Sequence, residues 1–248
     1  MKKVIVLNKK EGETPLFALE KFRKNNPKYL DIPMTYAGRL DPMASGVLVI
    51  LAGEETKNKD KYLALDKEYD FSILFGFSTD TYDVLGKVLK NSNALPKNIE
   101  VDLKNSLKYY KGKIKQKYPI YSSKTVKGKP LFSYARSGES VEIPERDINI
   151  KKITLGKISK INNKNLFLNI EKRINKVKRD FRQKEILKIW KNKLLDDKKA
   201  QVFYIADLKI KCSSGTYIRA LANSLGEKIK IPALAFSIKR TKIGKYAI

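Results

Sequence analysis

The chain has 248 residues, with 53 Lys and Arg against 26 Asp and Glu, which gives a formal net charge of +27. This excess favours an anionic partner, nucleic acid above all, although a bias toward AT-rich codons would produce it as well. The single cysteine excludes an intramolecular disulfide, and the absence of histidine excludes Ser-His-Asp catalysis and every zinc site that needs histidine.

The amino-terminal residues are expected to alternate between strand, helix and loop. An apolar run at residues 4–7 predicts a buried strand; it is too short for a signal-peptide core or a membrane span, so a cytoplasmic protein is expected. Apolar residues at helical spacing predict a helix over residues 15–25, with Thr14 as its N-cap. Four glycines and prolines within residues 32–46 predict a loop.

Further along the chain, the same patterns predict more elements of both kinds. Apolar runs, continuous or alternating, predict strands at residues 47–52, 68–75, 148–153, 166–170 and 203–211. Helical spacing predicts helices at residues 54–65, 99–109, 130–137 and 216–229. Because strands and helices are interleaved, with gaps of hairpin length in places, the predicted fold class is mixed α/β.

Residues 171–199 differ from the rest of the chain because they are rich in Lys and Arg, with apolar side chains near helical spacing. Two interpretations remain open: a surface helix that packs through one apolar stripe, or a basic arm that follows an RNA backbone. The residues of this stripe are Ile174, Val177, Phe181, Ile186, Ile189, Trp190 and Leu194.

Several cofactor-binding patterns are absent from the sequence. It contains no GxxxxGK[ST] phosphate loop, no GxGxxG turn after a strand, and no cysteine cluster for zinc or iron–sulfur. Any chemistry is therefore expected to come from carboxylates, hydroxyls, Lys and Arg, without a cofactor or a metal.

The most unusual segment is residues 36–46, Tyr-Ala-Gly-Arg-Leu-Asp-Pro-Met-Ala-Ser-Gly. Asp41 precedes a proline, which disfavours the α region and keeps the aspartate extended. Gly38 and Gly46 permit sharp bends and the close approach of another backbone. The segment presents a lone carboxylate on a rigid loop beside the cationic Arg39, but taken alone it is more simply explained as an Asp that starts a turn.

Residues 38–46 resemble the motif that holds the catalytic aspartate of TruB-type pseudouridine synthases, and other motifs of that family follow in order. They are Lys67-Glu-Tyr69, Gly76-Phe-Ser-Thr-Asp-Thr-Tyr-Asp83 with Gly86, Tyr121-Ser122 with Gly128-Lys129 and Tyr134-Ala-Arg136, Cys212-Ser-Ser-Gly-Thr-Tyr-Ile-Arg219 with Leu225-Gly226, and Lys239-Arg-Thr241 with Gly244. The resemblance spans residues 4–244. It implies one catalytic domain over residues 1–248, with the family's largely antiparallel central sheet flanked by helices and loops.

The chemistry that this resemblance implies is the isomerisation of uridine to pseudouridine in the T arm of tRNA, at position 55, without a cofactor. Asp41 is then the catalytic carboxylate, which either attacks the ribose or assists elimination of the base. Tyr69 matches a tyrosine that stacks on the target base and is implicated in removing its C5 proton. Arg219 matches the arginine that pairs with the aspartate and keeps it ionised, and Ile238 matches an aliphatic residue of the base pocket.

The target uridine must leave its stack to reach such a site, so aromatic and cationic side chains are expected around it. Besides Ile238, the residues expected to contact the RNA or the flipped base are Lys9, Tyr36, Arg39, Lys129, Arg136 and Tyr217.

The sequence departs from the family pattern at several places. Tyr36 occupies a position where the bacterial family usually has a histidine, so it could stack on a base but cannot become a cation near neutral pH. The early K-P-x-G-x-T-S pattern is weak over residues 9–15, and residues 171–199 resemble an insertion. The chain ends at Ile248 soon after the last motif, so no C-terminal PUA domain is expected, and the basic insertion is a candidate to replace its contribution to tRNA binding.

Three other functions compete with this interpretation: an RNA chaperone, a guide-dependent synthase similar to the dyskerin group, and a generic basic ribosome-associated protein. Intact Asp41, Tyr69 and Arg219 argue against a chaperone that has lost catalysis. Guide-dependent synthases normally need a PUA domain and partner proteins, and a generic basic protein leaves the ordered motifs unexplained. The expected partner is therefore tRNA, bound by a monomer that needs no other protein and no membrane.

Overall fold

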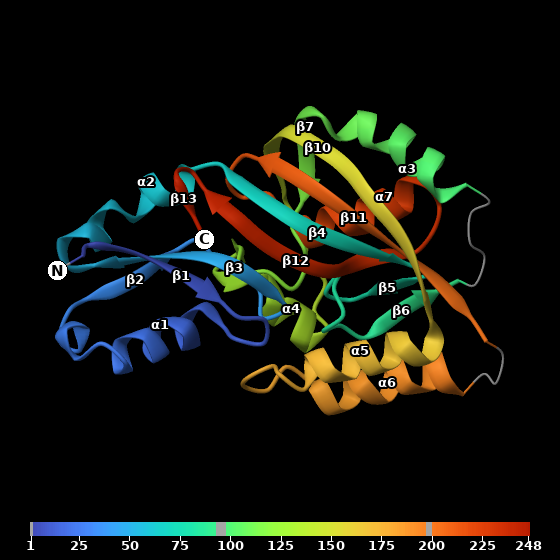
Figure 1. Cartoon of the computed structure of the whole chain (residues 1–248), viewed down its shortest axis with the longest axis horizontal. Coiled ribbons are helices and arrows are strands. Elements are labelled where there is room, and N and C mark those ends of the chain that lie inside the picture. Colours follow the sequence, from blue (N-terminus) through green and yellow to red (C-terminus); the bar gives the residue numbers. More distant parts are fainter. Residues whose placement is uncertain (1, 93–97, 197–199) are drawn as a thin grey trace.

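The computed structural model describes residues 2–92, 98–196 and 200–248 and is built around one large, twisted sheet. The strands follow one another across this sheet in the order β1-β3-β12-β4-β11-β10-β7, while β2 pairs with β3 and β13 with β12 (Figure 1). Two small two-stranded sheets, β5-β6 and β8-β9, lie outside it. The mixed α/β class predicted from the sequence is confirmed.

Thirteen strands are formed by the residues that the structure describes. Their bounds are β1 Val4–Lys9, β2 Met34–Ala37, β3 Ala44–Ala52, β4 Lys67–Phe75, β5 Phe77–Thr79, β6 Val88–Asn91, β7 Gly112–Lys117, β8 Thr125–Val126, β9 Lys129–Pro130, β10 Glu145–Asn162, β11 Val202–Cys212, β12 Ala233–Ile243 and β13 Tyr246–Ala247. All neighbours in the large sheet are antiparallel except β3 and β12, which run parallel and bring Ile238 opposite Ala44. This parallel pair connects the two halves of the sheet beside the segment that carries Asp41.

Seven α-helices and three short 3₁₀ turns accompany the strands in the described part of the chain. The helices are α1 Pro15–Lys24, α2 Lys59–Ala64, α3 Ile99–Leu107, α4 Leu131–Ser137, α5 Asn163–Ile174, α6 Gln183–Leu195 and α7 Ile218–Lys228; the 3₁₀ turns are Pro27–Tyr29, Gly53–Asn58 and Lys108–Tyr110. None of these helices, the longest being α6 with 13 residues, is long and apolar enough to cross a membrane.

The main core lies between the sheet and the helices α3 and α7. Leu221 and Leu225 of α7 and Leu103 of α3 are fully buried against apolar side chains of β4, β10 and β11. Gly226 allows α7 to approach β12 closely, because a Cβ added there would lie 2.5 Å from the Cβ of Ala233. This packing holds the amino-terminal end of α7, where Arg219 lies, against the sheet.

A second core joins the helices α5 and α6 to the sheet. Trp190 of α6 is fully buried, packs edge-on against Phe77 with ring centroids 5.0 Å apart, and donates from Nε1 to the carbonyl of Val84 at 3.1 Å. Complete burial of such a side chain contributes on the order of 2–3 kcal/mol. Of the two interpretations of residues 171–199, the structure therefore supports a helix packed through its apolar stripe; residues 197–199 lie outside the described part.

Several predicted elements are confirmed, including the strands around residues 47–52, 68–75 and 203–211 and the helix that begins after Thr14. The Thr14 hydroxyl accepts a hydrogen bond from the Phe17 amide at 3.1 Å, as an N-cap does. The helix predicted at residues 54–65 is only half α-helical, since residues 53–58 form 3₁₀ turns.

Two predictions of secondary structure are wrong. Residues 166–170 were expected to form a strand but lie in α5, because Asn162 caps a helix whose buried side chains continue at helical spacing to Ile174. Residues 32–46 were expected to form a loop, but Met34–Ala37 pairs with β3 as strand β2. Pro33 and Gly38 flank β2, whereas Gly46 lies within β3.

Candidate active site

A cavity of about 1020 Å³ opens where the Asp41 loop, β4, β12 and the start of α7 meet. Asp41, Tyr69, Arg219 and Ile238 all line it, so the structure brings together the four residues that the sequence places in the catalytic centre. Segments far apart in the sequence complete the walls, among them residues 121–123 and residues 179–182.

The loop that carries Asp41 is held from behind by a buried arginine, Arg240 of β12, which is only 2% exposed. Its Nε donates to the carbonyl of Val47 at 2.8 Å, and its Nη2 donates to the carbonyl of Gly38 at 3.0 Å. Gly38 has φ +85°, a conformation that favours glycine. The carbonyl of Pro42 accepts from the Gly12 amide at 2.8 Å, so the loop is anchored on both sides of Asp41.

The central feature of the cavity is a two-pronged ion pair between Asp41 and Arg219. Nε of Arg219 donates to Oδ2 of Asp41 at 2.7 Å, and Nη2 donates to Oδ1 at 3.1 Å. The side chain of Arg219 is 4% exposed while that of Asp41 is 40% exposed. The arginine therefore fixes the orientation of the carboxylate from the protein side and leaves its other face open to the cavity.

The surroundings of Arg219 keep its guanidinium charged and in one place. Nη1 donates to the carbonyl of Thr81, Nη2 also donates to the carbonyl of Tyr121 at 3.3 Å, and Nε lies 3.7 Å from Oδ2 of Asp83. Burial by itself lowers the pKa of Arg219, but the carboxylates of Asp41 and Asp83 outweigh it, so the pKa is raised. A cation is thus permanently present beside the candidate catalytic carboxylate.

Asp83 is the second carboxylate of this arrangement, although it was not among the site residues predicted from the sequence. Its Oδ1 accepts from the Thr81 hydroxyl at 2.7 Å and from the Leu85 amide at 3.0 Å. Burial raises the pKa of Asp83 to about 6, against the opposing influence of Arg219. Its position in the Thr-Asp-Thr-Tyr-Asp motif was the available signal, but a motif does not show which of its carboxylates faces the cavity.

Tyr69 and Ile238 form the apolar floor of the cavity from the neighbouring strands β4 and β12. Tyr69 is 8% exposed and lies opposite Arg240 in the register of these strands, and Ile238 is 7% exposed. Burial raises the pKa of Tyr69, whereas the nearby Arg240 acts in the opposite direction. An aromatic face beside an aliphatic side chain is suited to holding a planar base.

Tyr217, another candidate contact, lines the cavity immediately before α7. Its backbone is fixed by both ends of one amide side chain: Gln116 Oε1 accepts from the Tyr217 amide at 2.9 Å, and Gln116 Nε2 donates to the Tyr217 carbonyl at 3.0 Å. Its ring packs edge-on against Tyr118, with centroids 5.5 Å apart.

The remaining candidate RNA contacts lie at different distances from the cavity. Tyr36, Arg39 and Arg136 line it, and Arg39 hydrogen-bonds to Ser123 across it. Lys129 is exposed on β9, where its ammonium lies 3.6 Å from Glu139.

Lys9 does not fit the prediction that it contacts an RNA phosphate, because its side chain is fully buried. Its ammonium donates to the carbonyls of Glu13 at 2.6 Å and Lys10 at 3.0 Å, and burial lowers its pKa to about 8. The position of Lys9 at the end of β1 gave no indication of this burial in the sequence. Its contacts show that it closes the turn next to the Asp41 loop.

In the part of the chain that the structure describes, no three Asp, Glu or Cys side chains are grouped closely enough to hold a metal ion. The centre of the cavity is organised instead around Arg219 and the two carboxylates of Asp41 and Asp83.

Solved structures share the fold of this chain. Solved structures titled "Crystal Structure of a Cbf5-Nop10-Gar1 Complex" and "Structure of H/ACA RNP bound to a substrate RNA containing 2'-deoxyuridine" superpose with TM-scores of 0.58 and 0.55. Each match covers 98% of this chain and 49% or 48% of the solved chain, at 18% and 17% identity. These similarities establish that the chain has the fold of those proteins.

The family follows from the sequence comparisons. The family described as "TruB family pseudouridylate synthase (N terminal domain)" matches residues 32–175. The tRNA pseudouridine synthase B of Caldanaerobacter subterraneus subsp. tengcongensis is 35% identical, and the match covers 86% of this chain and 60% of that protein. The tRNA pseudouridine synthase B of Lactobacillus acidophilus is 34% identical, and the match covers 96% of this chain and 67% of that protein. The chain thus belongs to the TruB family, and it spans about three fifths to two thirds of the length of these relatives.

Proposed function

We propose that this chain isomerises uridine to pseudouridine in the T arm of tRNA, at position 55. The observation that carries the proposal is the Asp41 carboxylate, held by the buried Arg219 and open to a cavity, in a chain of the TruB family. The relatives named tRNA pseudouridine synthase B support tRNA as the substrate. The excess of Lys and Arg supports an RNA partner independently of them.

The reaction breaks the bond between ribose C1′ and uracil N1, turns the base, and forms a new bond between C1′ and C5. The proton on C5 is released, and N1 gains a proton. Asp41 takes part as an unprotonated carboxylate, either as the nucleophile at C1′ or as the group that assists elimination of the base. Arg219 holds this carboxylate in a fixed orientation toward the sugar, which provides the electrostatic preorganisation that the step needs.

Tyr69 and Ile238 hold the detached base in this proposal. The ring of Tyr69 stacks on uracil, and Ile238 limits the space in which the base can turn. Burial raises the pKa of Tyr69, with Arg240 acting in the opposite direction, so its hydroxyl is protonated at physiological pH. The Tyr69 oxygen can therefore accept the C5 proton only as it passes its own hydroxyl proton to the base, which gains a proton at N1.

The RNA-binding surface surrounds the mouth of the cavity. Tyr36 takes the place of the usual histidine and stacks on an RNA base, either at the position that the flipped uridine has left or in the cavity that it enters. Arg39, Arg136 and Lys129 contact phosphates. We also propose that the chain works as a cytoplasmic monomer without a protein partner.

The test uses tRNA transcripts labelled with tritium at C5 of uridine. The purified chain should release tritium from a transcript with the native T arm, because formation of the C1′–C5 bond expels that hydrogen. A transcript in which uridine 55 is replaced by cytidine should release none. Equal release from both transcripts would overturn the assignment of position 55, and no release from either, with tRNA bound, would favour an RNA chaperone.

A further inference from the structure

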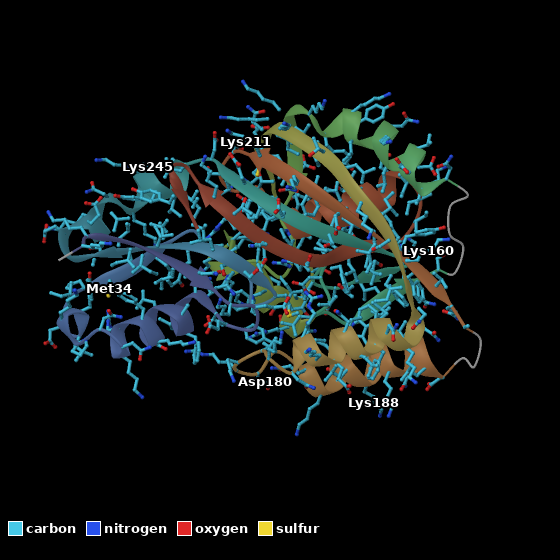
Figure 2. All side chains as sticks on the ribbon, in the orientation of Figure 1. Met34, Lys160, Asp180, Lys188, Lys211 and Lys245 are labelled. Atoms are coloured by element: carbon cyan, nitrogen blue, oxygen red, sulfur yellow. The ribbon has the colours of Figure 1, made fainter. Side chains whose placement is uncertain are left out.

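The helices α5 and α6 form a hairpin inserted between the paired strands β10 and β11. Figure 1 shows this hairpin along one side of the molecule, α5 in gold and α6 in orange, with its connecting segment directed toward α1. We call this connecting segment, residues 175–182, the hairpin tip. In Figure 2 its Asp180 lies at the end nearest α1, whereas Lys188 of α6 points away from the body of the protein. The tip therefore faces the body of the protein, whereas the outer surface of α6 faces away from it.

The hairpin tip is bound to the backbone that supports the Asp41 loop. The Gly12 carbonyl accepts from the Lys178 amide at 2.9 Å, and the Gly12 amide donates to the carbonyl of Pro42, the residue after Asp41. The contact is so close that a Cβ on Gly12 would lie 2.4 Å from the Lys176 carbonyl oxygen. The backbone of one residue, Gly12, thus joins the tip to the catalytic loop.

A salt bridge at the end of α5 strengthens this connection. Arg173 donates from Nη2 and Nε to Oε2 of Glu11, at 2.7 and 3.0 Å, and these side chains are 10% and 22% exposed. Limited exposure and two donors on one carboxylate oxygen distinguish this ion pair from the many weak pairs at protein surfaces.

Arg182 attaches the tip to the opposite part of the cavity wall. Its Nη1 donates to Oδ2 of Asp80 at 2.8 Å and to the Tyr121 hydroxyl at 2.9 Å, and its guanidinium lies 4.7 Å from the centre of the Tyr121 ring. The carbonyl of the same Tyr121 accepts from Arg219. Arg182 has φ +67°, a conformation that a non-glycine residue adopts at some energetic cost. The conformation of the tip is therefore fixed by contacts to Gly12 on one side and to Asp80 and Tyr121 on the other.

Lys176, Lys178 and Arg179 of the hairpin tip are all exposed, but of these three cations Arg179 is the one that lines the cavity. It lines the cavity with Asp180, Phe181 and Arg182, while Oδ1 of Asp180 is occupied by the Arg182 amide at 2.8 Å. A nucleotide whose base enters the cavity leaves its charged phosphates at the rim. A guanidinium at this rim can bind such a phosphate through two parallel hydrogen bonds without first losing a buried partner.

We propose that the hairpin tip is a phosphate-binding wall of the active site, in which Arg179 binds an RNA phosphate next to the target uridine. Arg182 is the positioning residue that holds this wall against Asp80 and Tyr121. The inference rests on the proposed function only in that the cavity accepts a nucleotide of RNA. It assigns the RNA contact of the inserted hairpin to its tip and not to the lysines along the outer face of α6.

The test measures the dissociation constant for tRNA as a function of salt for the full chain and its variants. Deleting the hairpin would expose the core around Trp190, so point substitutions are required. Arg179→Gln should raise the dissociation constant about fivefold and reduce the slope of log K against log salt by about one, the value for one lost phosphate contact. Arg179→Lys should retain most of the slope. Lys188→Gln is the matched control on the outward face.

Arg182→Gln should reproduce the weaker binding of Arg179→Gln, and the double variant should be no weaker than either single variant, because both changes remove the same contact. Equal affinities and slopes for Arg179→Gln, Lys188→Gln and the native chain would overturn the inference. The proposed function fails separately, in the tritium assay. If it is wrong, the native chain releases no tritium from C5-labelled tRNA, whatever the salt dependence of its binding.

Discussion

Arg219 and Arg179 line the same cavity but are held in opposite ways. Arg219 is nearly inaccessible to solvent and has two carboxylates beside it, so its charge is neutralised by the protein itself. Arg179 is exposed at the end of a segment that other residues fix in place. The comparison shows that a buried, paired arginine can orient a catalytic group, whereas an exposed arginine on a rigid support is available for a ligand.

Arg219→Met should have the largest effect because it leaves the carboxylates of Asp41 and Asp83 close together without their cation. Loss of one partner of a buried pair costs about 3–5 kcal/mol of unfolding free energy. The rate of tritium release should fall by more than about 100-fold, since the preorganised carboxylate is lost. Urea denaturation and the tritium assay measure the two effects. A variant with native activity would show that the pair does not position Asp41.

Trp190→Ala tests whether the hairpin that carries Arg179 is a rigid support, through its effect on the free energy of unfolding. Removing a fully buried Trp should cost about 3–5 kcal/mol, and the Val84 carbonyl would lose its donor. The folded fraction should keep a native rate constant for tritium release, because Trp190 lies outside the cavity. Lys188→Ala, on the outer face of α6, is the control and should change stability little. A stable Trp190→Ala variant would mean that the hairpin is not part of the core.

Asp83→Asn should have a smaller effect, which is to change how the free energy of unfolding depends on pH. Burial raises the pKa of Asp83 to about 6, so its contribution to stability is present at low pH and is lost as the pH rises through 6. The native chain should lose on the order of 3 kcal/mol between pH values of about 4 and 7 from this group, and Asp83→Asn should not. Urea denaturation at both pH values measures the difference, with the exposed Asp60→Asn as control. Parallel pH profiles for native chain and Asp83→Asn would contradict the account.

The fold class and the central pair could be predicted from the sequence for different reasons. Alternating apolar residues at positions 68–75 specify a strand locally, whereas the pairing of Asp41 with Arg219 was accessible only through the family resemblance. The helix α5 was missed because a five-residue apolar window cannot distinguish a strand from a helix, and its cap lies outside that window.

The residues that were missed or misjudged depend on contacts across the whole chain. Arg240 and Val47 are separated by 193 positions, and no local pattern shows that a cationic side chain of a strand supports a distant loop. Lys9 looks like a surface lysine in the sequence, but the turn at Glu13 encloses its ammonium. The role of Arg182 depends on a similar long-range contact, to Asp80.

The most direct test of the central claim is single-turnover release of tritium from C5-labelled tRNA by the native chain, Asp41→Asn and the exposed control Asp60→Asn, with tRNA binding measured in the same samples. The account predicts release by the native chain and the control, and none by Asp41→Asn despite unchanged folding and binding. Release by Asp41→Asn at the native rate would show that the carboxylate held by Arg219 is not the catalytic group.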